Sequence, residues 1–384
     1  MAATPSLHSK LPLWEPSIFD TMNQVSRKYN ALNLAQGYPD FGTDPELVRL
    51  LQQAVADGHN QYAPMAGVYT LREAIAAKTE SLYGACYDPE TEITLTNGAT
   101  QAIFTAIAAS IRPGDEVIIF KPAYDCYEPT VKAHGGIPVL QQLQGEDFHI
   151  DWEALEAAIG PKTRMLVLNS PHNPSGTVLK AADLLRLEKL LENTNILVLS
   201  DEAYEHLVYD GLEHQSFCRY PGLRERTFIC ASFGKTFHVT GWKLGYCLAP
   251  AALMQEFQKL HEFIVFSVNH PAQRAVCQYL EDPSRYLDLN AFFQRKRDLF
   301  LEALQGSRFR WKPSEGTYFQ LLDYSAISGE PDRDFAEALA REHGVAAIPI
   351  SVFNLNREDR HQLRFCFAKA DDTLLRAAEI LCRL

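Results

Sequence analysis

Short, continuous apolar runs alternate with helical stretches through the middle of the chain. The runs, between residues 93 and 249, are ITLT, EVIIF, RMLVLN, ILVLSD, TFICAS and LGYCLA. Helical patterns lie between them, such as residues 99–110 and 151–159. Asp151 is the expected N-terminal cap of the second of these helices. Strands that are apolar throughout are typical of a parallel sheet covered on both faces by helices. The sequence therefore predicts an α/β fold built on a mainly parallel sheet.

The C-terminal part of the chain follows a different pattern. A long helical stretch near 285–305 precedes the strand-like GTYFQLLDY, a helix near 333–343, and the apolar runs GVAAIPIS and QLRFCFA. This order predicts a second, smaller α+β domain. We expect an N-terminal segment that packs with the small domain, then a large domain and the small C-terminal domain, with boundaries at 1–40, 41–275 and 276–384.

The overall composition excludes several classes of protein. The net charge of −12 argues against a nucleic-acid partner, because phosphate backbones need a basic surface. The densest basic cluster, Arg295-Lys296-Arg297, is interpreted as a solvated helix face. No apolar run approaches the roughly 18 residues of a membrane span, and the first residues lack the apolar core of an export signal. The eight cysteines form no C-x-x-C pair, so we expect reduced thiols, no metal site and a cytoplasmic protein.

Polar residues gather just after five of the predicted strands. They lie at 97–100, 121–124, 169–173, 201–204 and 232–235. Ligands of such sheets collect at the carboxyl ends of the strands. We therefore expect the five loops to build one site.

The loop SFGKTFHVTGWKLG, residues 232–245, contains a Gly-Lys-Thr that is typical of nucleotide-binding loops. Those loops require a glycine where this chain has Ile229, and no G-x-G-x-x-G follows a strand, so nucleotide and dinucleotide binding are set aside. Lys235 is either a surface lysine or an amine of lowered pKa that attacks aldehydes. Asp201 either caps the next helix or pairs with a cationic ring nitrogen. Pyridoxal phosphate requires both such groups, a lysine at its aldehyde and a carboxylate at its pyridinium nitrogen.

Two further segments carry charge-binding residues. NGATQ, residues 97–101, is either an ordinary strand-to-helix turn or an anion site, with the N–H groups of Ala99 and Thr100 as donors. Ser232 and Lys243 are candidates for further phosphate contacts. Arg364 lies inside an apolar run and needs a carboxylate, which belongs either to a structural Asp or Glu or to a substrate.

The order and spacing of these motifs resemble the class I and II aminotransferases over essentially the whole chain. The motifs are GAT (98–100), Tyr124, NSPHNPSG (169–176), SDEAY (200–204), SFGK (232–235) and Arg364-Phe365. The resemblance implies a fold-type I enzyme with pyridoxal 5'-phosphate and a seven-stranded sheet in its large domain. LAQGYPDF, NQYAPMAGVYTLREAI, SFGKTFHVTGWKLGY and GVAAIPISVF look like the bacterial methionine aminotransferases and the related kynurenine aminotransferase and glutamine transaminase K group. In that group, as here, position 243 is Lys where many class I members have Arg.

The resemblance also implies roles for individual residues. Lys235 bonds to the cofactor aldehyde and serves as base and acid, Asp201 holds the ring nitrogen, and Tyr204 and Asn173 bind the ring oxygen. Tyr124 stacks on the ring. The residues implied at the phosphate are Gly98, Ala99, Thr100, Ser232 and Lys243, with Tyr62 reaching the site of the neighbouring subunit in a homodimer. The residues implied at the substrate are Gly37, Tyr38, Asn173 and Arg364.

The substrate is less well defined by the sequence. The implied reaction exchanges an amino group between an amino acid and a 2-oxo acid by a ping-pong mechanism. Candidate walls of the side-chain pocket are Phe19, Tyr38, Phe266 and Phe353, which favour methionine, aromatic amino acids, glutamine or kynurenine over dicarboxylates. Animal kynurenine aminotransferases carry Phe-His where this chain has Val268-Asn269, which argues against a kynurenine preference. The alternatives that stay open are cysteine-conjugate or cystathionine β-elimination at the same site, and a ligand-sensing domain of a transcription regulator.

Overall fold

The fold is described from a computed structural model, which covers residues 9–12 and 15–384. Its helices are α1 (Ile18–Tyr29), α2 (Pro45–Ala56), α3 (Tyr69–Tyr83), α4 (Gly98–Ser110), α5 (Tyr127–Ala133), α6 (Trp152–Ala158), α7 (Ala181–Leu191), α8 (Pro221–Arg224), α9 (Phe233–Thr236), α10 (Ala251–Ile264), α11 (His270–Tyr279), α12 (Ser284–Leu287), α13 (Leu289–Ala303), α14 (Asp332–Ala338) and α15 (Asp371–Leu381). Its strands are β1 (Leu32–Asn33), β2 (Ile93–Thr96), β3 (Glu116–Lys121), β4 (Ile137–Gln142), β5 (Thr163–Asn169), β6 (Leu197–Asp201), β7 (Thr227–Ser232), β8 (Gly245–Leu248), β9 (Phe319–Asp323), β10 (Val345–Ala346), β11 (Ile348–Pro349) and β12 (Gln362–Cys366).

The central element is a seven-stranded sheet of order β2-β8-β7-β6-β5-β3-β4. The pairs from β7 to β4 are parallel, whereas β8 runs antiparallel to both β2 and β7. The predicted α/β, mainly parallel sheet is therefore confirmed. The apolar-run pattern misses only β4 among these strands, because Pro138 interrupts its apolar residues and this edge strand is half-buried along most of its length.

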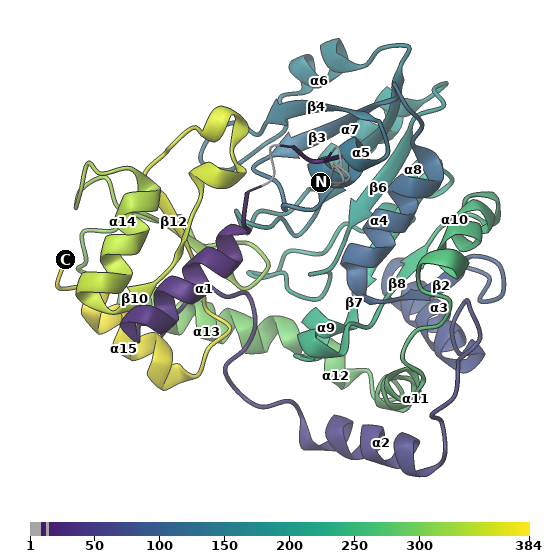
Figure 1. The fold of residues 1–384 in the computed structure, drawn as a ribbon, viewed down its shortest axis with the longest axis horizontal. Coiled ribbons are helices and arrows are strands. Elements are labelled where there is room, and N and C mark those ends of the chain that lie inside the picture. Colours follow the sequence, from purple (N-terminus) through teal and green to yellow (C-terminus); the bar gives the residue numbers. More distant parts are fainter. Residues whose placement is uncertain (1–8, 13–14) are drawn as a thin grey trace, which may run out of the picture.

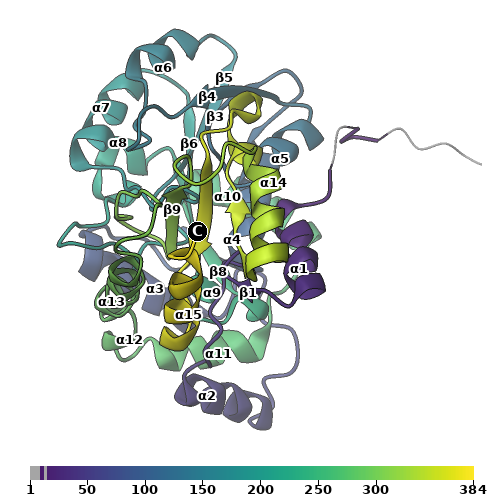
Figure 2. The ribbon, with the colours of Figure 1, turned by 90° about the vertical axis from the view of Figure 1, so that its left-hand side faces the viewer.

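Helices cover both faces of this sheet (Figure 2), with α7 and α8 on one side and α4, α5 and α10 on the other. Successive side chains of one strand pack into two separate hydrophobic cores, one on each face of the sheet. In β3, Ile118 and Phe120 join one core, and Val117 and Ile119 join the other. This alternation explains why the strands are apolar throughout. Among the described residues, no helix combines the length and the apolar character that crossing a membrane requires.

The N-terminal segment lies against the C-terminal part of the chain (Figure 1), where α1 runs beside α14 and β10. β1 pairs in parallel with β10, and Leu32 is the register partner of Val345. A separate antiparallel sheet of order β11-β12-β9 carries the predicted strand of Arg364.

The interpretation of Arg295-Lys296-Arg297 as a solvated face is wrong for two of its three members. Only Arg295 is exposed, while Lys296 is 4 % and Arg297 is 3 % exposed. Lys296 Nζ donates to the carbonyl of Lys369 at 2.7 Å, and Arg297 makes two hydrogen bonds to the Asp210 carboxylate at 2.6 and 2.7 Å. These side chains tie α13 to its neighbours.

Candidate functional site

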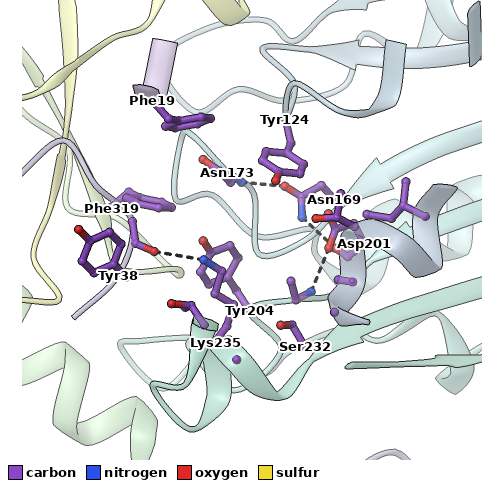
Figure 3. A pocket seen from close by; sticks show the side chains of 18 of the residues that line it. Phe19, Tyr38, Tyr124, Asn169, Asn173, Asp201, Tyr204, Ser232, Lys235 and Phe319 are labelled. Carbon is purple, nitrogen blue, oxygen red and sulfur yellow. Dashed lines mark hydrogen bonds between the residues drawn. The ribbon is translucent and has the colours of Figure 1, made fainter. Parts of the chain in front are cut away.

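The five polar loops converge on one cavity of about 250 Å³ at the carboxyl edge of the large sheet, as expected (Figure 3). In this view Lys235 and Tyr204 lie on the lower side of the cavity, and Tyr124 and Phe19 lie on its upper side. The loops after β2, β3, β5, β6 and β7 all contribute, together with the N-terminal segment and β12. The predicted site residues in its lining are Gly37, Tyr38, Gly98, Ala99, Thr100, Tyr124, Asn173, Asp201, Tyr204, Ser232, Lys235, Lys243 and Arg364.

The N-terminus of α4 forms one end of the cavity. Its cap residue, Asn97, makes no side-chain capping bond, and the first N–H groups of any helix lack intrahelical acceptors. Gly98 has a φ of +76°, and a Cβ at this position would lie 3.3 Å from Nζ of Lys243. A glycine therefore lets the ammonium group of Lys243 approach the helix start. The helix dipole and this ammonium group both favour an anion here.

Asp201 lies at the end of β6 and is 5 % exposed. Tyr127 donates a hydrogen bond of 2.6 Å to its Oδ2, and the N–H of Ala203 donates one of 3.1 Å to its Oδ1. Burial raises the pKa of Asp201, and the Tyr127 hydrogen bond acts in the opposite direction. No cationic side chain of the described residues lies within ion-pair distance, and Lys235 acts on this buried carboxylate only from farther away.

Lys235 lies in α9, directly after β7. Its Nζ donates to the carbonyl of Gly37 at 3.1 Å, and the Tyr318 hydroxyl donates to the same oxygen at 2.6 Å. The ammonium lies 5.7 Å from the ring centres of both Tyr204 and Tyr318. Desolvation lowers the pKa of Lys235 to about 8. A neutral amine is therefore accessible near physiological pH, which a nucleophile or a general base requires.

Arg364 is buried on β12 and is 1 % exposed. Its guanidinium donates to Oδ1 of Asn173 at 2.7 Å and to the carbonyl of Ala35 at 3.2 Å. It stacks on Phe319, with 3.8 Å from Cζ to the ring centre. Among the described residues no carboxylate lies within 4.0 Å, and Nε has no hydrogen-bond partner. Of the two alternatives from the sequence, a structural acidic partner is therefore excluded within these residues.

Asn173 and Gly37 lie beside this arginine. Because Oδ1 of Asn173 accepts from Arg364, its Nδ2 stays available as a donor to the cavity. A Cβ on Gly37 would lie 2.8 Å from Cζ of Phe319, so only glycine fits at this position. The Nδ2 group of Asn173 thus adds a side-chain donor next to the guanidinium group.

The structure places only two of the four predicted wall residues at the cavity. Phe19 and Tyr38 line the cavity, whereas Phe353 packs behind Phe19, with 5.8 Å between ring centres. Phe266 lies on the surface of the chain, 52 % exposed, where it contacts Tyr62 edge to face at 5.1 Å. Tyr62 is 79 % exposed and does not line this cavity.

Sequence reasoning missed three residues at the site: Tyr127, Tyr318 and Phe319. Tyr127 comes three residues after Tyr124 in KPAYDCY. This spacing is close to one helical turn and is a local signal that both side chains lie on the same side of the segment. Tyr318 and Phe319 come from GTYFQLLDY, which carries no local signal of proximity to Lys235 or Arg364.

Three charged groups in the lining of the cavity have no ion-pair partner among the described residues: Asp201, Lys243 and Arg364. With Lys235, they form a set that suits a ligand with a cationic ring nitrogen, an aldehyde and a phosphate, accompanied by a second, carboxylate-bearing molecule. These are the features of pyridoxal phosphate and an amino acid. The residues present therefore fit this cofactor.

Comparison with known proteins gives one consistent result. The family model for aminotransferase classes I and II matches residues 29–381. A methionine aminotransferase of Escherichia coli (strain K12) is 48% identical over 377 residues, which is 98% of each chain. An Escherichia coli crystal structure reported with a methionine aminotransferase function has a TM-score of 0.97 at 47% identity, covering 99% of this chain and 100% of that one. A kynurenine–oxoglutarate transaminase 1 of Rattus norvegicus is 33% identical, over 94% of this chain and 93% of its own.

Proposed function

We propose, because the chain belongs to the class I and II aminotransferase family, that it uses pyridoxal 5'-phosphate to transfer the amino group of an apolar amino acid, methionine above all, to a 2-oxo acid. Aromatic amino acids and glutamine are further candidate donors. The observation that carries the proposal is the buried Arg364, which has no acidic partner among the described residues and faces the cavity next to Lys235. An uncompensated buried guanidinium is costly, and a substrate α-carboxylate would compensate it.

The residues of the chain divide the work of binding the cofactor. The start of α4, with Gly98, Ala99 and Thr100, would hold the phosphate together with Ser232 and Lys243. Asp201 would hold a proton at the ring nitrogen, which gives its carboxylate an ion-pair partner. Asn173 Nδ2 and the Tyr204 hydroxyl would donate to the ring oxygen, and Tyr124 would cover the ring face.

When bound, the cofactor supplies an aldehyde that takes up the amino group and a ring that accepts electrons from the substrate Cα. The chain supplies orientation and proton transfer. Arg364 grips the α-carboxylate, Asn173 lies beside it, and Gly37 belongs to the same cavity lining. Lys235 Nζ takes the proton from the substrate Cα and holds it for return, since its pKa of about 8 allows both protonation states. Two such half-reactions, with the donor product leaving before the 2-oxo acid binds, give ping-pong kinetics.

The side-chain pocket supports an apolar substrate. Phe19 and Tyr38 line it. Apart from Lys235, Lys243 and Arg364, which already have proposed roles, the described lining contains no Lys or Arg. A dicarboxylate would need a further cation. The kynurenine–oxoglutarate transaminases among the relatives make an aromatic donor the second candidate. Elimination from thioether amino acids would use the same Lys235 as base and is the alternative reaction.

The proposal includes a homodimer with shared sites, in which Tyr62 reaches the phosphate of the neighbouring subunit. The high exposure of Tyr62 and Phe266, which contact each other, supports an apolar contact surface at this place. We also propose the predicted division into an N-terminal segment (1–40), a large domain (41–275) and a small domain (276–384), supported by the pairing of β1 with β10.

The first experiment is an absorbance spectrum of the cofactor-loaded protein before and after methionine is added without a 2-oxo acid. We expect the visible band of lysine-bound cofactor to disappear and the band of the aminated cofactor to appear. An unchanged visible band would reject methionine as donor, and phenylalanine, glutamine, kynurenine and cystathionine would be tested next. Release of ammonia and pyruvate from a thioether amino acid would favour elimination.

A further inference from the structure

The side chains of the loop Asp201–His206 point in two directions. Asp201 and Tyr204 line the cavity, whereas Glu202, Glu205 and His206 lie away from it in the protein interior. The side chains of Glu202 and Glu205 are 2 % and 6 % exposed. A buried carboxylate is stable only when cations and hydrogen-bond donors surround it, so these two groups fix the back of the loop.

Glu205 is surrounded by donors from two other elements. Lys78, on α3, donates to its Oε1 at 2.7 Å, and Tyr246, on β8, donates to the same oxygen at 2.7 Å. Tyr83, also on α3, donates to its Oε2 at 2.8 Å. Burial raises the pKa of Glu205, but Lys78, His206 and the Tyr246 hydroxyl together hold the pKa well below its usual range, with Lys78 as the largest of the three contributions.

Lys78 is itself fully occupied. Besides Glu205, its Nζ bonds the Tyr246 hydroxyl at 2.8 Å and Nε2 of His206 at 3.2 Å. Burial lowers the pKa of His206 to about 3, so its neutral ring accepts from the ammonium. The three partners of one lysine therefore include Glu205 and His206, the two residues that directly follow Tyr204.

Glu202 is held by a different set of groups. His214 bonds its Oε2 at 2.8 Å, while Ser200 and the N–H of Phe217 donate to its Oε1 at 2.9 and 3.1 Å. The loop is thus anchored on both sides of Tyr204. Only the anchor at Glu205 depends on a single cation from outside the loop, which is Lys78.

We infer that Lys78, through its ion pair with Glu205, is a positioning residue that fixes the Tyr204 hydroxyl over the cavity next to Lys235. The inference rests on the proposed function, in which this hydroxyl donates to the cofactor ring oxygen. Such a donor makes the bound cofactor a weaker base, because it stabilises the deprotonated form. Loss of Lys78 loosens the loop and weakens this hydrogen bond.

The test is the pH midpoint of the visible absorbance band of the cofactor-loaded protein, measured for Lys78→Met and Tyr204→Phe alone and combined. We expect each single variant to raise the midpoint, by about one pH unit for Tyr204→Phe, the size of one hydrogen bond. Lys78→Met should add nothing in the Tyr204→Phe background, because both changes act on the same hydroxyl. An equal shift in both backgrounds would overturn the inference.

Arg72→Met is the matched control. Arg72 is a cation on the same helix, 5 % exposed, but it bonds the carbonyls of Pro89 and Glu90, away from the Tyr204 loop. We expect it to lower thermal stability without moving the midpoint. If Lys78→Met behaves the same way, the role of Lys78 is only structural and the inference fails.

Tyr246→Phe covers the case in which Lys78→Met does not fold. It removes a single hydroxyl that contacts both Lys78 and Glu205, and it should raise the midpoint by less than Lys78→Met. An unchanged midpoint in Tyr246→Phe would count against the inference. A lack of any visible band in the unmutated protein would overturn the proposed function, and this inference with it.

Discussion

The hydroxyl of Tyr127 donates a hydrogen bond of 2.6 Å to Oδ2 of Asp201, and both side chains are buried. This bond stabilises the charged form of a carboxylate whose pKa burial raises. It therefore acts on the group that we propose to hold the cofactor ring nitrogen.

Tyr127→Phe tests this relationship. We expect kcat/KM at neutral pH to fall roughly tenfold or more, because hydrogen bonds to charged groups contribute about 1.5–3 kcal/mol. The ionised carboxylate is the working form, so activity is lost as pH falls through the pKa of Asp201, and the acidic limb of the pH profile should move to higher pH. Tyr87→Phe is the control, since Tyr87 is also buried and its hydroxyl has no hydrogen-bond partner among the residues that the structure describes. It should leave the profile in place.

Arg364→Met should separate stability from activity. Loss of the carboxylate grip should lower kcat/KM by roughly 100-fold or more, about 3 kcal/mol. Within the described part of the chain this buried cation has no carboxylate partner, so its removal should at the same time raise the Tm of the cofactor-free protein. Kinetics and thermal unfolding measure the two effects.

Arg297→Met provides the opposite pattern for comparison. This arginine is as deeply buried, but it bonds the Asp210 carboxylate twice. It should lower Tm and leave KM unchanged. A lower Tm in Arg364→Met as well would show that Arg364 is held for structural reasons.

The lowered pKa of Lys235 predicts how the cofactor-free protein takes up pyridoxal phosphate. Only the neutral amine attacks an aldehyde, so the uptake rate should rise with pH and level off above about 8. Stopped-flow absorbance measures the rate, and Lys235→Arg should abolish the covalent step. A rate that still climbs steeply toward pH 10 would show that the amine is not perturbed.

The shared site predicts complementation between two inactive variants. Chains with Lys235→Ala and chains with Tyr62→Ala, mixed and reassociated, should form hybrid dimers in which one site carries both changes and the other carries neither. Random mixing should then restore about one quarter of wild-type activity, because half of the dimers are hybrids with one intact site each. No recovery beyond the sum of the two separate variants would reject the contribution of Tyr62 to a neighbouring site.

The large sheet and the site at its edge could be predicted from local patterns. Strands buried on both faces are apolar throughout, as in β5 and β6, and polar residues at their ends mark the site directly. Such positions single out Asp201 and Lys235, since Asp201 is the last residue of β6 and Lys235 comes shortly after β7. The roles assigned to them, like those of the other site residues, stay predictions until the variants are measured.

Features that depend on distant partners could not be predicted locally. Lys296 and Arg297 are buried because the fold brings them against partners that are distant in the sequence. These partners are Lys369, Asp371 and Asp210. A local charge pattern contains no such information. Tyr318 is brought to the Lys235 site by contacts with distant residues, such as its hydrogen bond to the carbonyl of Gly37, 281 residues earlier in the sequence.

The pairing of β1 with β10 also has a consequence for synthesis of the protein. The two strands are roughly 300 residues apart in the sequence. β1 therefore leaves the ribosome long before β10 has been synthesised, and it cannot pair until then. At bacterial and eukaryotic elongation rates this delay is roughly 15 to 60 seconds, longer than most domains need to fold. Leu32 and the apolar face of α1 stay without their native cover during that time. The beginning of the chain is therefore where we expect nascent-chain chaperones to bind most persistently.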